Sequence, residues 1–249
     1  MYNRETFEYR KLDASNYLSY SENALSLLTI ISEWAEMPIS EITYFNVIDF
    51  FVMHFEIEIV FFDSSSGTYK SIYDCFNPEV LEVDATFYKH VSGFTVTNGS
   101  SFKIFLHKYR NKHRIIFTLL HELAHIYFHC SDNSYMQIFA SMDVRSHYPD
   151  EILPFEDEAN VIASILYLNN EKLVEYLDDG SSFDLILAKH CISRRALHNR
   201  IKNYLIYDLG LNHDVAISKY LVPYRSEVYG KYAITQLQSV MSMSKSFHF

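Results

Sequence analysis

The segment His121-Glu122-Leu123-Ala124-His125 constrains this chain more than any other feature of its sequence. On an α-helix, residues i and i+4 lie on one face about 6 Å apart along the axis, so both imidazoles can reach one metal ion. A glutamate directly after the first histidine borders the open side of that metal. The segment therefore predicts a zinc site with His121 and His125 as ligands and Glu122 as the catalytic base.

The flanking residues favour a long buried helix around this segment. Residues 113–129 contain no Gly or Pro, and apolar side chains are spread almost all round the predicted helix. Such a helix is buried, and a buried helix can hold metal ligands within the narrow tolerance that a metal site requires. We therefore expect one helix from His113 to His129.

A third protein ligand is expected, because catalytic zinc usually takes three and leaves a fourth position for water. His129 is the nearest candidate in the sequence. On a straight helix, however, it lies about 12 Å along the axis from His121, which is too far for both rings to bind one ion. The third ligand must therefore come from another element.

Residues 155–167 offer such an element, since an acidic first turn follows Pro154 and leads into an apolar helix. Glu156 and Asn160 share one face of this predicted helix, while Glu158 points elsewhere. Glu156 can therefore bind the metal, and Asn160 can orient a ligand histidine. A solvated helix start is the alternative, and the nearby HExxH motif makes it the less favoured one.

Residues 116–125, followed by His129 and by residues 156–160 and Ala163, resemble the ImmA/IrrE family of bacterial metallopeptidases. Members commonly read FTLAHELGH and, further along, ExEANxFA. The resemblance covers roughly residues 45–170, and its departures, such as Ala124 in place of the usual Gly, remove no metal ligand. It implies Zn²⁺ as cofactor, Glu122 as catalytic base and three ligands: His121, His125 and Glu156.

The resemblance also implies an α+β fold with a zincin-like, more narrowly gluzincin-like, core in which a small mixed sheet packs on the active-site helix. Residues 22–36 and 42–55 have helical patterns, and residues 56–62 and 101–107 have strand patterns. In zincins, an edge strand before the active-site helix commonly receives the substrate backbone. Residues 102–106 are the candidate for that strand.

A small all-helical module is expected at the C-terminal end. Residues 183–202 predict a helix, a turn and a second helix capped by Ser193, and the pattern is similar to helix-turn-helix domains. Four basic residues could face DNA: Arg194, Arg195, Arg200 and Lys202. We favour a structural helical pair, because the chain carries a net charge of −10, whereas broad contact with nucleic acid needs a basic surface.

These patterns predict three segments: an N-terminal arm at residues 1–20, the metallopeptidase domain at 21–175, and the helical module and tail at 181–249. The first 13 residues lack the apolar stretch of a secretory signal. The most apolar stretch, residues 42–62, is interrupted by charged residues and does not predict a membrane span. The three cysteines form no CxxC pair, so a cytoplasmic location is expected.

The sequence therefore predicts a cytoplasmic zinc metallopeptidase that acts as an endopeptidase. By the resemblance, its substrate and partner is a helix-turn-helix repressor of a mobile element or stress regulon. One alternative is a non-proteolytic zinc-binding regulator that binds DNA or a repressor, and another is a toxin-like hydrolase of a paired system. An oxyanion donor is also expected, with four open candidates: His129, Tyr135, His147 and Tyr148.

Overall fold

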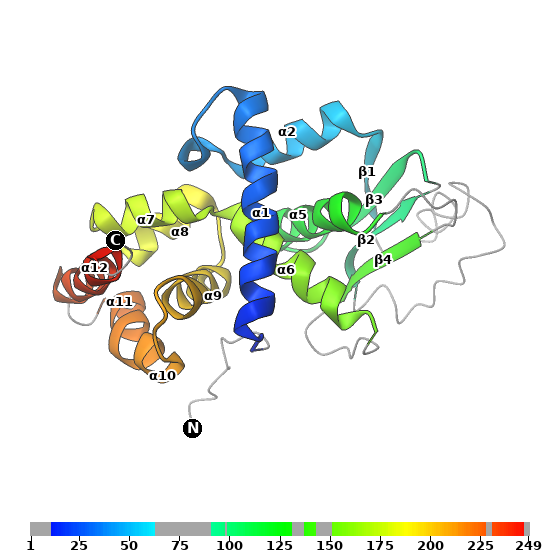
Figure 1. Ribbon diagram of the computed structural model, residues 1–249. Helices are drawn as coiled ribbons and strands as arrows, with labels where there is room; N and C mark the ends of the chain where they lie inside the picture. Colours follow the sequence, from blue (N-terminus) through cyan, green and yellow to red (C-terminus); the bar gives the residue numbers. More distant parts are fainter. Residues whose placement is uncertain are drawn as a thin grey trace. The chain divides into compact units, whose positions relative to one another are not determined.

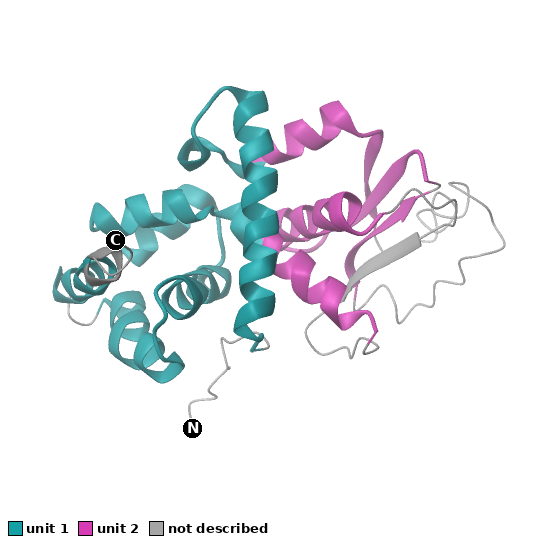
Figure 2. Ribbon diagram, viewed as in Figure 1, with its two compact units in different colours: residues 1–44, 164–249 teal, residues 45–163 magenta. Residues whose placement is uncertain are grey.

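The structure is a computed structural model that describes residues 11–62, 91–97, 99–130, 137–142, 151–227 and 231–246 (Figure 1). The chain divides into two compact units, one of residues 45–163 and the other of residues 1–44 together with 164–249 (Figure 2). This division differs from the three predicted segments. Residues from both ends of the chain build one unit, a pairing that local sequence patterns do not reveal.

The unit of residues 45–163 contains a four-stranded mixed sheet in the order β1-β3-β2-β4. Strand β1 (Ile57–Phe62) is parallel to β3 (Phe102–His107). Strand β2 (Val91–Thr97) is antiparallel both to β3 and to β4 (Gln137–Met142). The small mixed sheet and its helices confirm the predicted α+β class.

The prediction that residues 102–106 form an edge strand is wrong. Phe105, in the middle of β3, is opposite Val60 of β1 on one side and Phe94 of β2 on the other. The backbone groups of β3 are therefore already used in two ladders and cannot receive an added peptide. Among the described strands, the edges of the sheet are β1 and β4.

Three helices accompany the sheet: α2 (Tyr44–His54), α5 (Lys112–Phe128) and the first part of α6 (Leu153–Tyr167). Helix α5 begins after Asn111, whose side chain accepts a hydrogen bond of 2.9 Å from the backbone N–H of Arg114, as an N-cap residue does. The helix predicted at residues 113–129 is thus confirmed to within one residue at each end. It packs against β2 and β3.

Gly93 allows α5 to lie close to the sheet. A Cβ atom at this position of β2 would be 2.5 Å from Thr118 Cγ2 of α5 and 2.9 Å from the carbonyl oxygen of Phe105. Both separations are shorter than van der Waals contact, so only glycine fits without a shift of helix or strand. The glycine therefore helps to set the distance between α5 and β2.

The second unit is helical, and its described elements are α1 (Ala14–Ala35), η1 (Ile39–Glu41), α7 (Asn170–Asp178), α8 (Phe183–His190), α9 (Arg194–Asn203), η2 (Tyr204–Asp208), α10 (His213–Val215), η3 (Ala216–Leu221), α11 (Val222–Ser226) and α12 (Lys231–Ser246). Helix α1 starts well before the predicted residue 22. Asp13 caps it by accepting a hydrogen bond of 2.9 Å from the backbone N–H of Ser15, and Tyr17 is buried against Tyr207. Residues 14–20 of the predicted N-terminal arm are thus helix.

The predicted helix, turn and helix at residues 183–202 are present as α8 and α9. Ser193 caps α9 by accepting a hydrogen bond of 3.1 Å from the backbone N–H of Ala196. Arg200 is fully buried and donates from Nε to the carbonyl oxygen of Leu168 at 2.8 Å. Lys202 is also buried, so two of the four basic residues that could have faced DNA are enclosed within this unit instead.

None of the helices in the described ranges is both long and apolar enough to cross a membrane. From residue 222 onward, the described residues form α11 and α12.

Candidate metal centre

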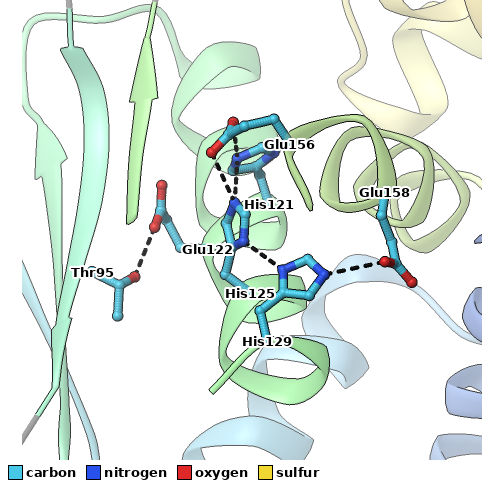
Figure 3. A network of polar contacts seen from close by, with 7 residues as sticks. All are labelled: Thr95, His121, Glu122, His125, His129, Glu156 and Glu158. Atoms are coloured by element: carbon cyan, nitrogen blue, oxygen red, sulfur yellow. Dashed lines mark hydrogen bonds and ion pairs between the residues drawn. The ribbon is translucent and has the colours of Figure 1, made fainter. Parts of the chain in front are cut away.

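The three predicted metal ligands converge on one point (Figure 3). The Nε2 atoms of His121 and His125, one turn apart on α5, are separated by 3.0 Å. From α6, Glu156 brings Oε2 to 3.3 Å from His121 Nε2 and Oε1 to 3.4 Å from His125 Nε2. All three side chains are buried. The helical spacing of the histidines and the first turn of α6 thus build one compact donor set.

The geometry of this set fits a tetrahedral metal ion. Ligand atoms bound to zinc at 2.0–2.1 Å are about 3.3 Å apart in a tetrahedral arrangement, and the separations here are 3.0, 3.3 and 3.4 Å. Glu156 Oε2 is buried, and no hydrogen bond from the described residues satisfies it. A buried polar oxygen is expected to have a partner, and a cation next to the carboxylate would provide one.

The environment also keeps two of these donors, His125 and Glu156, in the protonation state that metal binding requires. Burial lowers the pKa of His125 to about 4, against the opposing effect of Glu156. Burial by itself would raise the pKa of Glu156, but the imidazoles of His121 and His125, whose Nε2 atoms lie 3.3 and 3.4 Å from its carboxylate oxygens, outweigh this effect and lower the pKa to about 2. At neutral pH, His125 is therefore neutral and Glu156 is ionised, the forms in which imidazole and carboxylate bind metals.

Glu122 lies beside this donor set on the side of the sheet (Figure 3). It is fully buried, and its Oε2 atom accepts a hydrogen bond of 2.8 Å from the Thr95 hydroxyl of β2. Through this bond, the Glu122 carboxylate is held in place by a residue 27 positions away in the sequence. Sequence reasoning missed Thr95, because nothing in the sequence distinguishes a threonine that contacts the site from any other threonine in a strand.

His129 does not join the three converging residues. Its Nδ1 atom lies 2.7 Å from Nδ1 of His125, and its Nε2 atom lies 3.2 Å from Oε2 of Glu158. Both ring nitrogens are thus engaged, which leaves none for an oxyanion. Asn160, expected to orient a ligand histidine, is exposed, and His129 occupies the place next to His125. The other three candidate oxyanion donors, Tyr135, His147 and Tyr148, lie outside the described residues.

Comparison with known proteins agrees with this geometry. Residues 83–202 match the family model of the IrrE N-terminal-like domain, peptidase family M78. These residues are thus similar to the ImmA/IrrE peptidases. The matched range contains every residue of the metal centre, from Thr95 to Glu158, and extends through α8 and most of α9. It supports a metallopeptidase of the ImmA/IrrE family. No curated protein and no solved structure matches the chain.

Proposed function

We propose that the protein is a zinc-dependent endopeptidase that hydrolyses a peptide bond in a regulatory protein. The observation that carries this proposal is the convergence of His121, His125 and Glu156 within reach of one ion, with Glu122 buried beside them. A purely structural metal site has no need of a buried glutamate at that position. The match of residues 83–202 to a peptidase family model supports the same reaction class.

Each residue has a distinct role in this proposal. His121, His125 and Glu156 hold the ion, which when bound lowers the pKa of a water molecule and polarises a carbonyl group. Glu122 accepts a proton from the attacking water and delivers it to the leaving amine, as general base and then general acid. The Thr95 hydroxyl holds the Glu122 carboxylate in place through their hydrogen bond.

For the substrate, we propose a helix-turn-helix repressor of a mobile element or stress regulon, cleaved in the cytoplasm. This choice is supported by the family resemblance alone. An extended segment of the repressor would add to β4 (Gln137–Met142), an edge strand of the sheet that the described residues form. Strand β4 is the edge next to β2, the strand that carries Thr95, so a peptide paired there would run along the sheet edge nearer to Glu122.

The Glu122→Gln variant tests the reaction class. It removes the base and retains the ligands, so we expect the zinc content to be unchanged. The substrate is a helix-turn-helix repressor from the same genome, and we expect its cleavage to be slower by about 100-fold or more. Fragments are measured by mass spectrometry over time, with Glu151→Gln, an exposed carboxylate before α6, as the control. If Glu122→Gln retains full biological activity, the alternative of a non-proteolytic zinc-binding regulator is favoured.

A further inference from the structure

Two side chains without a role in the proposed reaction form a polar chain behind one of the metal ligands (Figure 3). His125 directs Nε2 toward Glu156 and His121, and Nδ1 toward Nδ1 of His129 at 2.7 Å. His129 then directs Nε2 toward Glu158 Oε2 at 3.2 Å. This polar chain thus begins at the metal position and ends on the Glu158 carboxylate of α6.

Metal binding would assign every proton in this chain. A neutral imidazole that binds a metal through Nε2 carries its proton on Nδ1. His125 therefore donates to His129, whose Nδ1 atom must accept, and the remaining proton of His129 is on Nε2. That proton is donated to Glu158. All hydrogen bonds of the polar chain therefore run in one direction, from His125 through His129 to Glu158.

The two candidate ligand histidines differ in what lies next to their Nδ1 atoms. Within the described part of the chain, Nδ1 of His121 is buried and has no hydrogen-bond partner, whereas Nδ1 of His125 faces His129. His129 is itself held in place, because its side chain is 4% exposed and the Phe155 ring packs edge-on against it with centroids 5.0 Å apart. The orientation of His125 therefore depends on its neighbour more than that of His121 does.

Helix α6 contacts the histidines of α5 with two carboxylates. Glu156 and Glu158 are two residues apart, so their side chains leave the helix about 200° apart. Glu156 reaches the Nε2 atoms of His121 and His125, while Glu158 reaches the far nitrogen of His129. The first part of α6 thus provides one candidate ligand, Glu156, and also Glu158, which ends the polar chain behind a second candidate ligand, His125.

We propose that His129 and Glu158 are positioning residues that orient His125 for metal binding. In many metal sites a carboxylate accepts directly from the ligand histidine; here His129 is interposed and relays that contact to Glu158. The inference rests on the proposed metal site and goes beyond it, since it assigns a role to two residues that touch neither the ion nor the substrate.

Metal affinity and the cobalt spectrum test this role without reference to catalysis. We expect His129→Leu to weaken Zn²⁺ binding by about 10- to 100-fold in competition with a chromophoric chelator, and to alter the visible absorption of the Co²⁺ form. His129→Asn keeps an acceptor near the Nδ1 position and should restore part of the affinity. A residue that only fills space would not be rescued in this way.

Glu158→Ala should weaken Zn²⁺ binding in the same direction, because His129 loses its acceptor. The matched control is Asp157→Ala, which removes the same charge from the same turn of α6 and should stay close to the wild type. Urea unfolding of each metal-free variant establishes that it is folded. If His129→Leu does not fold, Glu158→Ala and its control decide.

The outcomes separate the two proposals. If the wild-type protein binds neither Zn²⁺ nor Co²⁺, the metal site and the positioning role both fall. If the wild type binds and the His129 and Glu158 variants bind equally well with unchanged cobalt spectra, the positioning role is overturned and the metal site stands. Equal losses in Glu158→Ala and Asp157→Ala would also overturn it, because general charge would then explain the effect.

Discussion

Thr95 holds the carboxylate of Glu122 from the neighbouring strand, and the 2.8 Å hydrogen bond between them is buried. Thr95→Val keeps the shape of the side chain and removes the hydroxyl. Because a hydrogen bond to a charged group contributes about 1.5–3 kcal/mol, we expect kcat to fall by about tenfold or more, with metal content unchanged. Steady-state kinetics measure the change.

Thr95→Ser, which keeps the hydroxyl, should retain most of the activity and is the control. A Thr95→Val enzyme with wild-type kcat would mean that the orientation of Glu122 does not depend on this bond.

Among the residues of the site, those close in sequence or tied to a helical repeat were predictable. His121 and His125 follow from a spacing of four on a helix, and Glu156 follows from an acidic first turn that precedes an apolar helix. Thr95 and the contact between His129 and Glu158 were not predictable. They depend on which strand and which helix lie next to α5, and no local pattern encodes that.

At the scale of elements, the approach of α5 to β2 depends on Gly93. In Gly93→Ala, the added methyl group would be 2.5 Å from Thr118 Cγ2, so helix or strand must shift. We expect the free energy of unfolding to fall by about 1–3 kcal/mol, as is usual for overpacked cores. Urea unfolding measures it.

A second substitution, Thr118→Ser, removes the methyl group in closest contact and should recover part of the loss caused by Gly93→Ala. If Gly93→Ala is as stable as the wild type, the close approach of helix and strand is not what this glycine permits.

The sequence predicted the elements better than their arrangement. The α5 helix was predicted to within one residue because its apolar pattern is unbroken. The edge position assigned to residues 102–106 was wrong, since a strand pattern gives alternation and length but not the neighbours in the sheet. The start of α1 was missed because the cap at Asp13 precedes a polar first turn.

At the scale of the whole molecule, buried histidines make stability depend on pH. Burial, followed by the charges of Arg225 and Lys202, lowers the pKa of His198 to about 4, and burial likewise lowers the pKa of His190 to about 4. In the unfolded chain, histidine has its ordinary pKa of about 6.5. Between these values the unfolded chain binds protons that the folded chain does not, so lowering the pH favours unfolding.

We therefore expect the free energy of unfolding of the metal-free protein to fall as the pH is lowered from about 7 to about 5. The pKa of His125 is lowered as well and contributes in the same direction. His198→Gln removes one of these groups and should flatten the dependence. Urea unfolding at a series of pH values measures it, and equal slopes in variant and wild type would contradict the assignment.

The proposed function requires that His121, His125 and Glu156 together bind one metal ion. The most direct test is the metal content of protein purified without chelator or added metal, measured by mass spectrometry for the wild type, Glu156→Ala and the exposed control Glu151→Ala. We expect about one zinc ion per chain in the wild type and control, with loss or marked weakening of zinc binding in Glu156→Ala. A wild-type protein without metal, or a Glu156→Ala variant with full metal content, would contradict it.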